Sequence, residues 1–260
     1  MPIIQALDRA LRILDLFDEH TPELKLTEIS ARMNLHKSTV HALIRTLQIH
    51  GYIEQDEESG KYRLGLRMLE KGQLLLQNLD IRNVARPHLQ ALSDATGQTA
   101  HLLILDGREG VYIDKVEGSQ AAIRYSRIGR RVPLHSSASG KVLAAFQPPE
   151  TLERLLAGYT YARHTPNTID SEAKFRRELE EVRKTGCAFD REENEPGVMC
   201  IAAPIFGHDG QVLAAMSLSC MTARVDEAET RRLAERVRET TAEISARLGH
   251  RAQPVSKIIH

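Results

Sequence analysis

The order of short segments in the first 65 residues constrains the fold more than any other feature of this sequence. Apolar residues spaced three and four apart predict a first amphipathic helix and lie at Ile4, Leu7, Leu11, Leu14 and Phe17. Thr27 is expected to cap a short second helix, residues 34–36 to form a tight turn, and residues 37–47 to form a third helix. Two short strands around residues 56–60 predict a hairpin. This order of elements is typical of a winged helix-turn-helix.

The predicted third helix carries an apolar stripe and a polar face. The polar face is locally basic, because no acidic residue lies between residues 29 and 53. An α-helix fits the major groove of DNA and its first side chains reach the base edges, while hydroxyl groups suit phosphate oxygens. The candidate DNA-binding residues are Thr27, Lys37, Ser38, Thr39, His41 and Arg45 on the predicted helices, and Lys61 and Arg63 on the hairpin.

Total charge does not decide between DNA binding and other functions. The chain holds 35 basic and 35 acidic residues, and its formal net charge is zero. A zero net charge argues against a nonspecific polybasic protein but is compatible with DNA binding, so a DNA-binding function has to rest on where the charges lie. A small three-helix module with a hairpin can also mediate protein contacts, and a polar helix face is often simply solvated.

The rest of the chain predicts a larger α+β domain. Residues 64–79 are expected to form a linking helix interrupted near Gly72, and the helix at residues 83–96 to have irregular first turns at Pro87. Strands separated by short Gly-containing loops predict two hairpins, and helices and a further strand are expected around them. The hairpins are expected at 101–105 with 111–116 and at 201–206 with 211–220, the strand at 121–125, and the helices from 139, at 171–185 and at 226–248.

These elements lack a regular βαβ alternation, so an antiparallel sheet is expected. The predicted domains are the winged helix-turn-helix, a linker helix, the α+β domain and a C-terminal tail. Their predicted bounds are 1–65, 66–82, 83–252 and 253–260.

Two polar segments of the larger domain are candidate ligand sites. Strand alternation places Ser217 and Ser219 on one face beside small residues, and Cys200 lies on the hairpin partner. Small side chains with a few hydroxyls leave room for a ligand, although serines can equally alternate on a solvated face. The hydroxyl-rich segment 135–141 leads into a helix, whose N-terminus attracts anions such as a carboxylate.

Enzyme, metal and secreted classes find little support. The three cysteines show no zinc spacing or disulfide framework, and no catalytic motif or phosphate loop is present. Four acids near residue 193 are expected to be solvated rather than catalytic; they are Asp190, Glu192, Glu193 and Glu195. The sequence predicts no cofactor and no metal. The charged opening segment does not resemble a signal peptide and no apolar run would span a membrane, so a cytoplasmic location is expected.

The chain resembles the IclR-type bacterial transcription regulators over nearly its whole length. The matching segments are 6–11, 26–30, 37–40, 133–135, 138–141, 186–190 with Glu193, and 200–206. Gly207 departs from the family pattern, which usually has Asp or Asn in this turn.

The resemblance implies a winged helix-turn-helix followed by a GAF-like effector domain. It implies a homodimer or dimer of dimers that binds paired operator half-sites and senses a small organic acid, such as a carboxylate, sugar acid or aromatic acid. The function expected is repression of a catabolic operon. The implied effector-binding residues are Ser139, Gly140, Leu143, Asp190, Cys200, Ser217 and Ser219. A metabolite or redox sensor that does not bind DNA remains the alternative function. Within the resemblance, Cys200 is expected to form a small part of the pocket wall, with a redox or metal role as its alternative.

Overall fold

The computed structural model describes residues 3–18, 20–77, 80–120 and 126–250. The chain divides into two compact units, Met1–Asn78 and Leu79–His260. The predicted strand at 121–125 and the predicted tail at 253–260 lie outside the described residues. The predicted linker segment 66–82 is divided between the last helix of the first unit and the first helix of the second.

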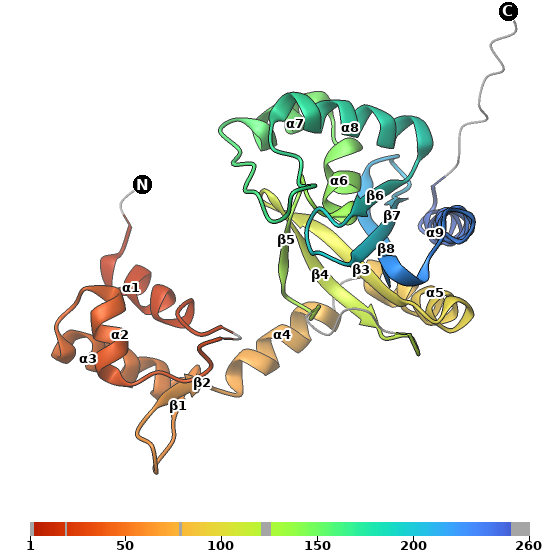
Figure 1. Cartoon of the computed structure of the whole chain (residues 1–260). Coiled ribbons are helices and arrows are strands. Elements are labelled where there is room, and N and C mark those ends of the chain that lie inside the picture. Colours follow the sequence, from red (N-terminus) through yellow and green to blue (C-terminus); the bar gives the residue numbers. More distant parts are fainter. Residues whose placement is uncertain (1–2, 19, 78–79, 121–125, 251–260) are drawn as a thin grey trace, which may run out of the picture. The chain divides into compact units, whose positions relative to one another are not determined.

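The first unit is a helix-turn-helix with a two-stranded wing (Figure 1). Its elements are α1 (Gln5–Leu14), α2 (Leu26–Met33), α3 (Lys37–Ile49), β1 (Ile53–Gln55), β2 (Tyr62–Leu64) and α4 (Arg67–Gln77). Asn34 takes a left-handed conformation with φ of 51° at the end of α2, which makes the predicted tight turn. The strands β1 and β2 pair antiparallel, so the predicted wing is confirmed.

Two details of this unit differ from the sequence-based expectations. Ile13 of α1 and Phe17 just after it are buried in the core, whereas Leu7 and Leu11 of the predicted stripe are more than half exposed. Thr27 does not cap α2, because the helix already begins at Leu26. The start of α2 is instead stabilised by Glu28, whose carboxylate accepts a hydrogen bond from the Lys25 backbone N–H at 2.7 Å.

Two predicted irregularities are wrong. Helix α4 continues through Gly72 without interruption. Helix α5 (Asp80–Thr96) also begins three residues earlier than predicted and runs through Pro87. Proline removes one helical hydrogen bond, but neighbouring contacts can sustain the helix: Leu89 and Leu92 of α5 are buried in the core.

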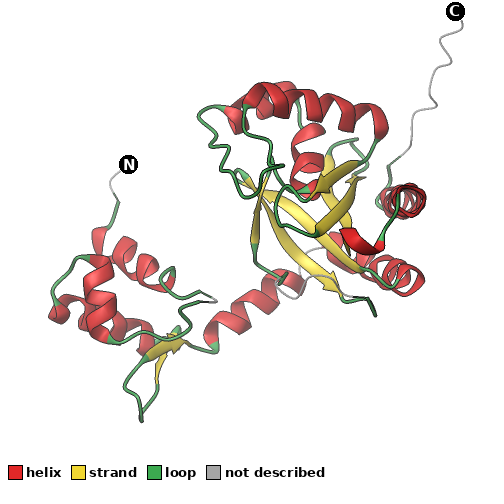
Figure 2. Ribbon diagram, viewed as in Figure 1, coloured by secondary structure: helices red, strands yellow, loops and turns green. Residues whose placement is uncertain are grey.

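The second unit is a six-stranded antiparallel sheet between two helical layers (Figure 2). The strand order is β5-β4-β3-β8-β7-β6. The strands are β3 (Thr99–Asp106), β4 (Glu109–Val116), β5 (Arg131–Pro133), β6 (Ala188–Arg191), β7 (Val198–Phe206) and β8 (Val212–Met221). The helices besides α5 are α6 (Ala138–Ala145), α7 (Pro149–Leu156), α8 (Glu172–Thr185) and α9 (Glu227–Arg247), with a 3-10 turn at Thr222–Arg224.

Strand alternation divides the core of this unit into two clusters. Met216, Leu218 and Cys220 pack toward α5 and α9, while Leu103 and Ala215 pack toward α6, α7 and α8. Both hairpins, the three helices and the α+β class with an antiparallel sheet are confirmed. The short elements β5, β6 and α7 were not predicted.

Candidate DNA-binding face and effector cavity

Helix α3 separates apolar and polar residues cleanly. Val40 and Ile44 are fully buried in the core of the first unit. Lys37, Ser38 and Arg45 are exposed, as is His41, and Thr39 is half-buried. The start of α3 has no side-chain cap, so no capping side chain occupies its first N–H groups. This face has the shape and chemistry that a DNA groove requires.

The hairpin residues are less freely available than the sequence suggests. Lys61 Nζ lies 3.5 Å from a carboxylate oxygen of Glu23, and Arg63 lies 3.5 Å from Glu54. Both basic side chains are substantially exposed, so these ion pairs are weak and a phosphate can replace the carboxylate. Their DNA-binding role stays a prediction, as does that of exposed Thr27 on α2.

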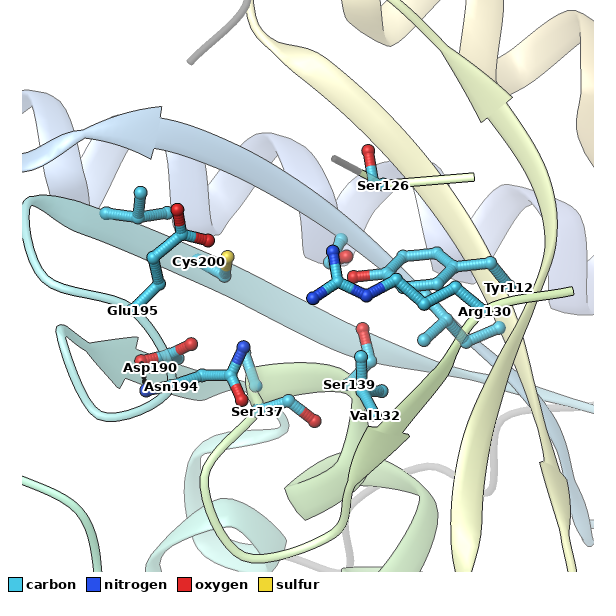
Figure 3. Close-up of a pocket in the computed structure, with 14 residues that line it drawn as sticks. Tyr112, Ser126, Arg130, Val132, Ser137, Ser139, Asp190, Asn194, Glu195 and Cys200 are labelled. Carbon is cyan, nitrogen blue, oxygen red and sulfur yellow. Dashed lines mark hydrogen bonds between the residues drawn. The ribbon is translucent and has the colours of Figure 1, made fainter. Parts of the chain in front are cut away.

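A cavity lies between the α6 face of the sheet and the segment that enters α6 (Figure 3). It has a volume of about 30 Å³. The lining residues are Leu103, Tyr112, Ser126, Arg130, Val132, Ser137, Ala138, Ser139, Asp190, Asn194, Glu195, Val198, Cys200 and Ser217.

Four of the seven predicted effector residues line this cavity: Ser139, Asp190, Cys200 and Ser217. The other three are absent from its lining. Gly140 has a packing role, because a Cβ there would lie 2.4 Å from the Pro133 carbonyl oxygen. Leu143 is fully buried in the apolar core, and Ser219 lies behind Cys200 at 3.1 Å from its sulfur. Direct contact of these three with an effector stays a prediction.

Asp190 fixes the β6–β7 loop at the edge of the cavity. Its Oδ1 accepts the backbone N–H groups of Glu193 at 2.7 Å and Asn194 at 3.2 Å. Burial raises the pKa of the Asp190 carboxyl to about 7, although these hydrogen bonds act in the opposite direction. Asp190 and Glu193 are buried, so the expectation that all four nearby acids are solvated is wrong for these two.

The serines beside the cavity are not on a solvated face. Ser217 and Ser219 are buried, and Ser219 links Cys200 to His101, whose Nδ1 lies 3.5 Å away. The Nε2 of His101 lies 2.8 Å from the Ser126 hydroxyl. Burial lowers the pKa of His101 to about 3, so this histidine is neutral.

Cys200 is poorly suited to redox chemistry. Burial raises the pKa of its thiol well above the usual value, with Asp190 acting in the same direction. The thiolate is the reactive form of cysteine, so this environment disfavours oxidation and metal binding. Within the described residues, no cluster of three His, Cys, Asp or Glu side chains could hold a metal ion.

Sequence reasoning missed several residues of the cavity. Arg130 extends into it from one side, and Asn194 and Glu195 lie on the opposite side (Figure 3). Arg130 comes just before β5, which leads into the helix-start segment, so its position was a usable signal. Asn194 gave no pattern and Glu195 was expected to be solvated, because the turn after β6 sets the direction of both side chains.

An exposed recognition helix in one unit and a polar cavity in the other define a helix-turn-helix regulator with a sensor domain. Residues 6–57 match the IclR helix-turn-helix domain, and residues 73–246 match the bacterial transcriptional regulator IclR C-terminal domain. The chain belongs to the IclR family of bacterial transcriptional regulators. It is a DNA-binding regulator and not an enzyme, as the sequence predicted.

Similar proteins support this assignment over nearly the whole chain. The HTH-type transcriptional regulator XynR of Escherichia coli is 52% identical over 97% of this chain and 100% of that protein. The DNA-binding transcriptional repressor YiaJ of Escherichia coli is 36% identical over 94% of this chain and 88% of that protein. An IclR homologue from Microbacterium hydrocarbonoxydans, solved with 4-hydroxybenzoate, is 28% identical, with a TM-score of 0.80 covering 94% of this chain and 98% of that one.

The described helices include no segment that is both long and apolar enough to cross a membrane.

Proposed function

We propose that this protein is a cytoplasmic repressor of a catabolic operon, released from or retained on its operator according to a small organic acid bound in the second unit. The exposed polar face of α3 is the observation that carries the DNA-binding part of this proposal. Lys37, Ser38, Thr39 and His41 are assigned to the groove and to phosphates near the start of α3, and Arg45 to a phosphate or a guanine.

A homodimer, alone or paired as a dimer of dimers, is proposed as the DNA-binding species. Large apolar side chains are exposed in the first unit: Ile3, Ile4, Leu7 and Leu11 in or just before α1, and Leu66 and Leu69 in or just before α4. A second copy of this chain is the occupant that suits a regulator, because two α3 helices can then contact paired half-sites. The hairpin residues Lys61 and Arg63 would contact flanking phosphates.

The cavity is proposed as the effector site. Arg130 provides a cation for a carboxylate, and Ser137, Ser139 and Ser217 provide hydroxyl groups. The relative YiaJ is named a repressor and the Microbacterium homologue was solved with an aromatic acid, which supports repression and an acidic ligand without fixing either here. Ligand binding would act by shifting the population between arrangements with different operator affinity.

A gel shift with the DNA upstream of the protein's own gene tests this function. We expect the protein to retard that fragment and not an unrelated fragment of the same length. We also expect one of three probes, pyruvate, D-gluconate or 4-hydroxybenzoate, to change the retardation. Thermal stabilisation of the protein by the same probe would indicate that the probe binds the protein and not the DNA. No specific retention would contradict the operator proposal, and no response to acids would contradict the effector proposal.

A further inference from the structure

Lys141 is a buried cation that the DNA-binding and effector assignments do not use. It lies in α6 and is fully buried. Its Nζ donates hydrogen bonds to Glu178 Oε1 at 2.9 Å, Glu193 Oε1 at 2.7 Å and the Phe189 carbonyl at 2.7 Å. All three ammonium donors are therefore satisfied, as a buried charge requires.

The three partners of Lys141 come from different elements. Glu178 lies on α8, Phe189 on β6, and Glu193 in the β6–β7 loop. This loop also carries Asn194 and Glu195, which line the cavity. Lys141 thus connects the helix that forms one side of the cavity with the loop that forms another.

The Glu193 carboxylate depends strongly on this contact. Its Oε1 accepts a hydrogen bond from Lys141 Nζ and a longer one, at 3.3 Å, from the Arg191 backbone N–H. Its Oε2 is buried and has no hydrogen-bond partner among the described residues. A buried carboxylate that loses its cation is strongly destabilised, so it would move toward solvent and take the loop with it.

Other hydrogen bonds also hold the β6–β7 loop. The hydroxyl groups of Thr165 and Thr168 donate to the carbonyl groups of Glu192 and Glu193 at 2.6 Å. The Ser136 hydroxyl donates to Asn194 Oδ1 at 3.2 Å. These bonds fix the backbone of the loop, whereas Lys141 neutralises its buried charge.

We infer that Lys141 is a positioning residue that holds the β6–β7 loop in the conformation that lines the cavity. The cation acts through Glu193 and the Phe189 carbonyl, and it touches no effector itself. A buried ion pair is seldom a large source of net stability, but it does fix a geometry that apolar packing would leave free. The consequence for ligand binding rests on the proposed effector function, whereas the positioning of the loop does not.

The matched pair of variants Glu193→Gln and Glu178→Gln tests this inference. Both variants remove a negative charge that pairs with the Lys141 ammonium group, but only Glu193 belongs to the loop. Amide hydrogen exchange of the full-length protein without ligand is the measurement. We expect about tenfold faster exchange in a peptide covering residues 192–195 for Glu193→Gln, which weakens the bond to Lys141, and still faster exchange for Lys141→Met, which leaves a buried carboxylate unpaired. Glu178→Gln is expected to stay close to wild type, and β8 to be unchanged in all variants.

Equal effects of the two glutamine variants, or a uniform loss of protection with no local change in the loop, would overturn the inference. If Lys141→Met does not fold, the glutamine pair still decides. The double variant Lys141→Met with Glu193→Gln gives a rescue test, because a neutral amide can stay buried without its cation. We expect slower loop exchange in the double variant than in Lys141→Met alone; equal or faster exchange would count against the inference.

Ligand affinity separates this inference from the proposed function. Whichever of pyruvate, D-gluconate and 4-hydroxybenzoate stabilises the wild type is expected to bind Glu193→Gln about tenfold more weakly and Glu178→Gln normally. Unchanged affinity in Glu193→Gln would show that the loop does not position the site. If none of the three binds the wild type, the effector proposal fails, and the exchange measurement still tests the role of Lys141.

Discussion

The two units of this protein use charged residues in opposite ways. Helix α3 exposes Lys37 and Arg45 to solvent, whereas the second unit buries Lys141 and Asp190. A surface that binds a large polyanion needs accessible charges on one rigid element, because salt and water can then exchange with phosphate. A cavity for a small ligand needs few charges, held by partners in a medium that strengthens each interaction.

The difference also separates local from long-range organisation. The polar face of α3 lies within nine consecutive residues, from Lys37 to Arg45. The cavity draws on residues from Leu103 to Ser217. Substitutions in the first unit are therefore expected to change DNA binding without changing the cavity, and substitutions around the cavity to change the response without changing the DNA-binding face.

The largest expected effect concerns the exposed apolar residues of α1. The double variant Leu7→Glu with Leu11→Glu places two like charges on the proposed dimer surface. We expect a monomer and at least about hundredfold weaker operator binding, because two linked half-site contacts become one. Analytical ultracentrifugation and a gel shift measure the two effects. Leu213→Glu, on an exposed leucine of β8, is the control; a dimer that survives the double variant would exclude this surface.

The next effect concerns the pH dependence of stability and tests whether burial of the Asp190 carboxyl group lowers the free energy of unfolding when the group is ionised. The pKa of Asp190 is raised from 3.8 to about 7 by burial. Between these values the folded protein keeps a proton that the unfolded chain releases, so stability falls as pH rises from about 4 to 7 and then levels off. Asp190→Asn removes this dependence while keeping an acceptor oxygen for the loop.

We expect the free energy of unfolding of Asp190→Asn, relative to wild type, to grow by an amount on the order of a few kcal/mol between pH 4 and pH 7. Urea unfolding at a series of pH values measures this difference. A difference that stays constant with pH would mean that Asp190 is ionised in the folded protein across this range.

A smaller effect is expected at the DNA-binding face. Arg45→Ala removes an exposed cation from α3, and loss of one base or phosphate contact corresponds to about tenfold weaker operator binding. The thermal response to an organic acid is expected to stay unchanged. Arg231→Ala on α9 makes the same charge change outside the first unit and is the control. Equal operator affinity of Arg45→Ala and wild type would remove Arg45 from the interface.

The smallest effect separates two neighbouring serines. Ser217 lines the cavity, whereas Ser219 contacts Cys200 and His101 behind it. Loss of one hydroxyl contact is expected to weaken effector binding several-fold, roughly 1 kcal/mol, in Ser217→Ala. Ser219→Ala alone is expected to have a weaker effect, and the double variant to blunt the response while operator binding survives.

Ser93→Ala is the control for this pair, since Ser93 is equally buried but donates to the Gln98 carbonyl away from the cavity. An intact response in the double variant would contradict the effector assignment of both serines. A larger effect of Ser219→Ala than of Ser217→Ala would move the ligand contact toward Cys200.

Much of the fold could be predicted because its signals are local. The loops at residues 107–108 and 207–211 separate strands with clear patterns, and both hairpins form as expected. The three-residue strand β5 and four-residue strand β6 could not be predicted, because such short segments take their strand conformation from the neighbours they pair with. The stripe on α1 was recognised, but its periodicity could not say whether the core or another molecule covers it.

The sequence by itself determined the winged helix-turn-helix, the polar residues of α3 and the antiparallel α+β class. These depend on spacing and turn chemistry within short segments, which neighbouring residues largely decide. Only the tertiary structure decided that Arg130 lies opposite Asn194 and Glu195, that Asp190 is buried, and that Lys141 contacts Glu193 of the β6–β7 loop (Figure 3). The burial and pairing of a charge depend on what the rest of the chain brings beside it, and no local pattern carries that information.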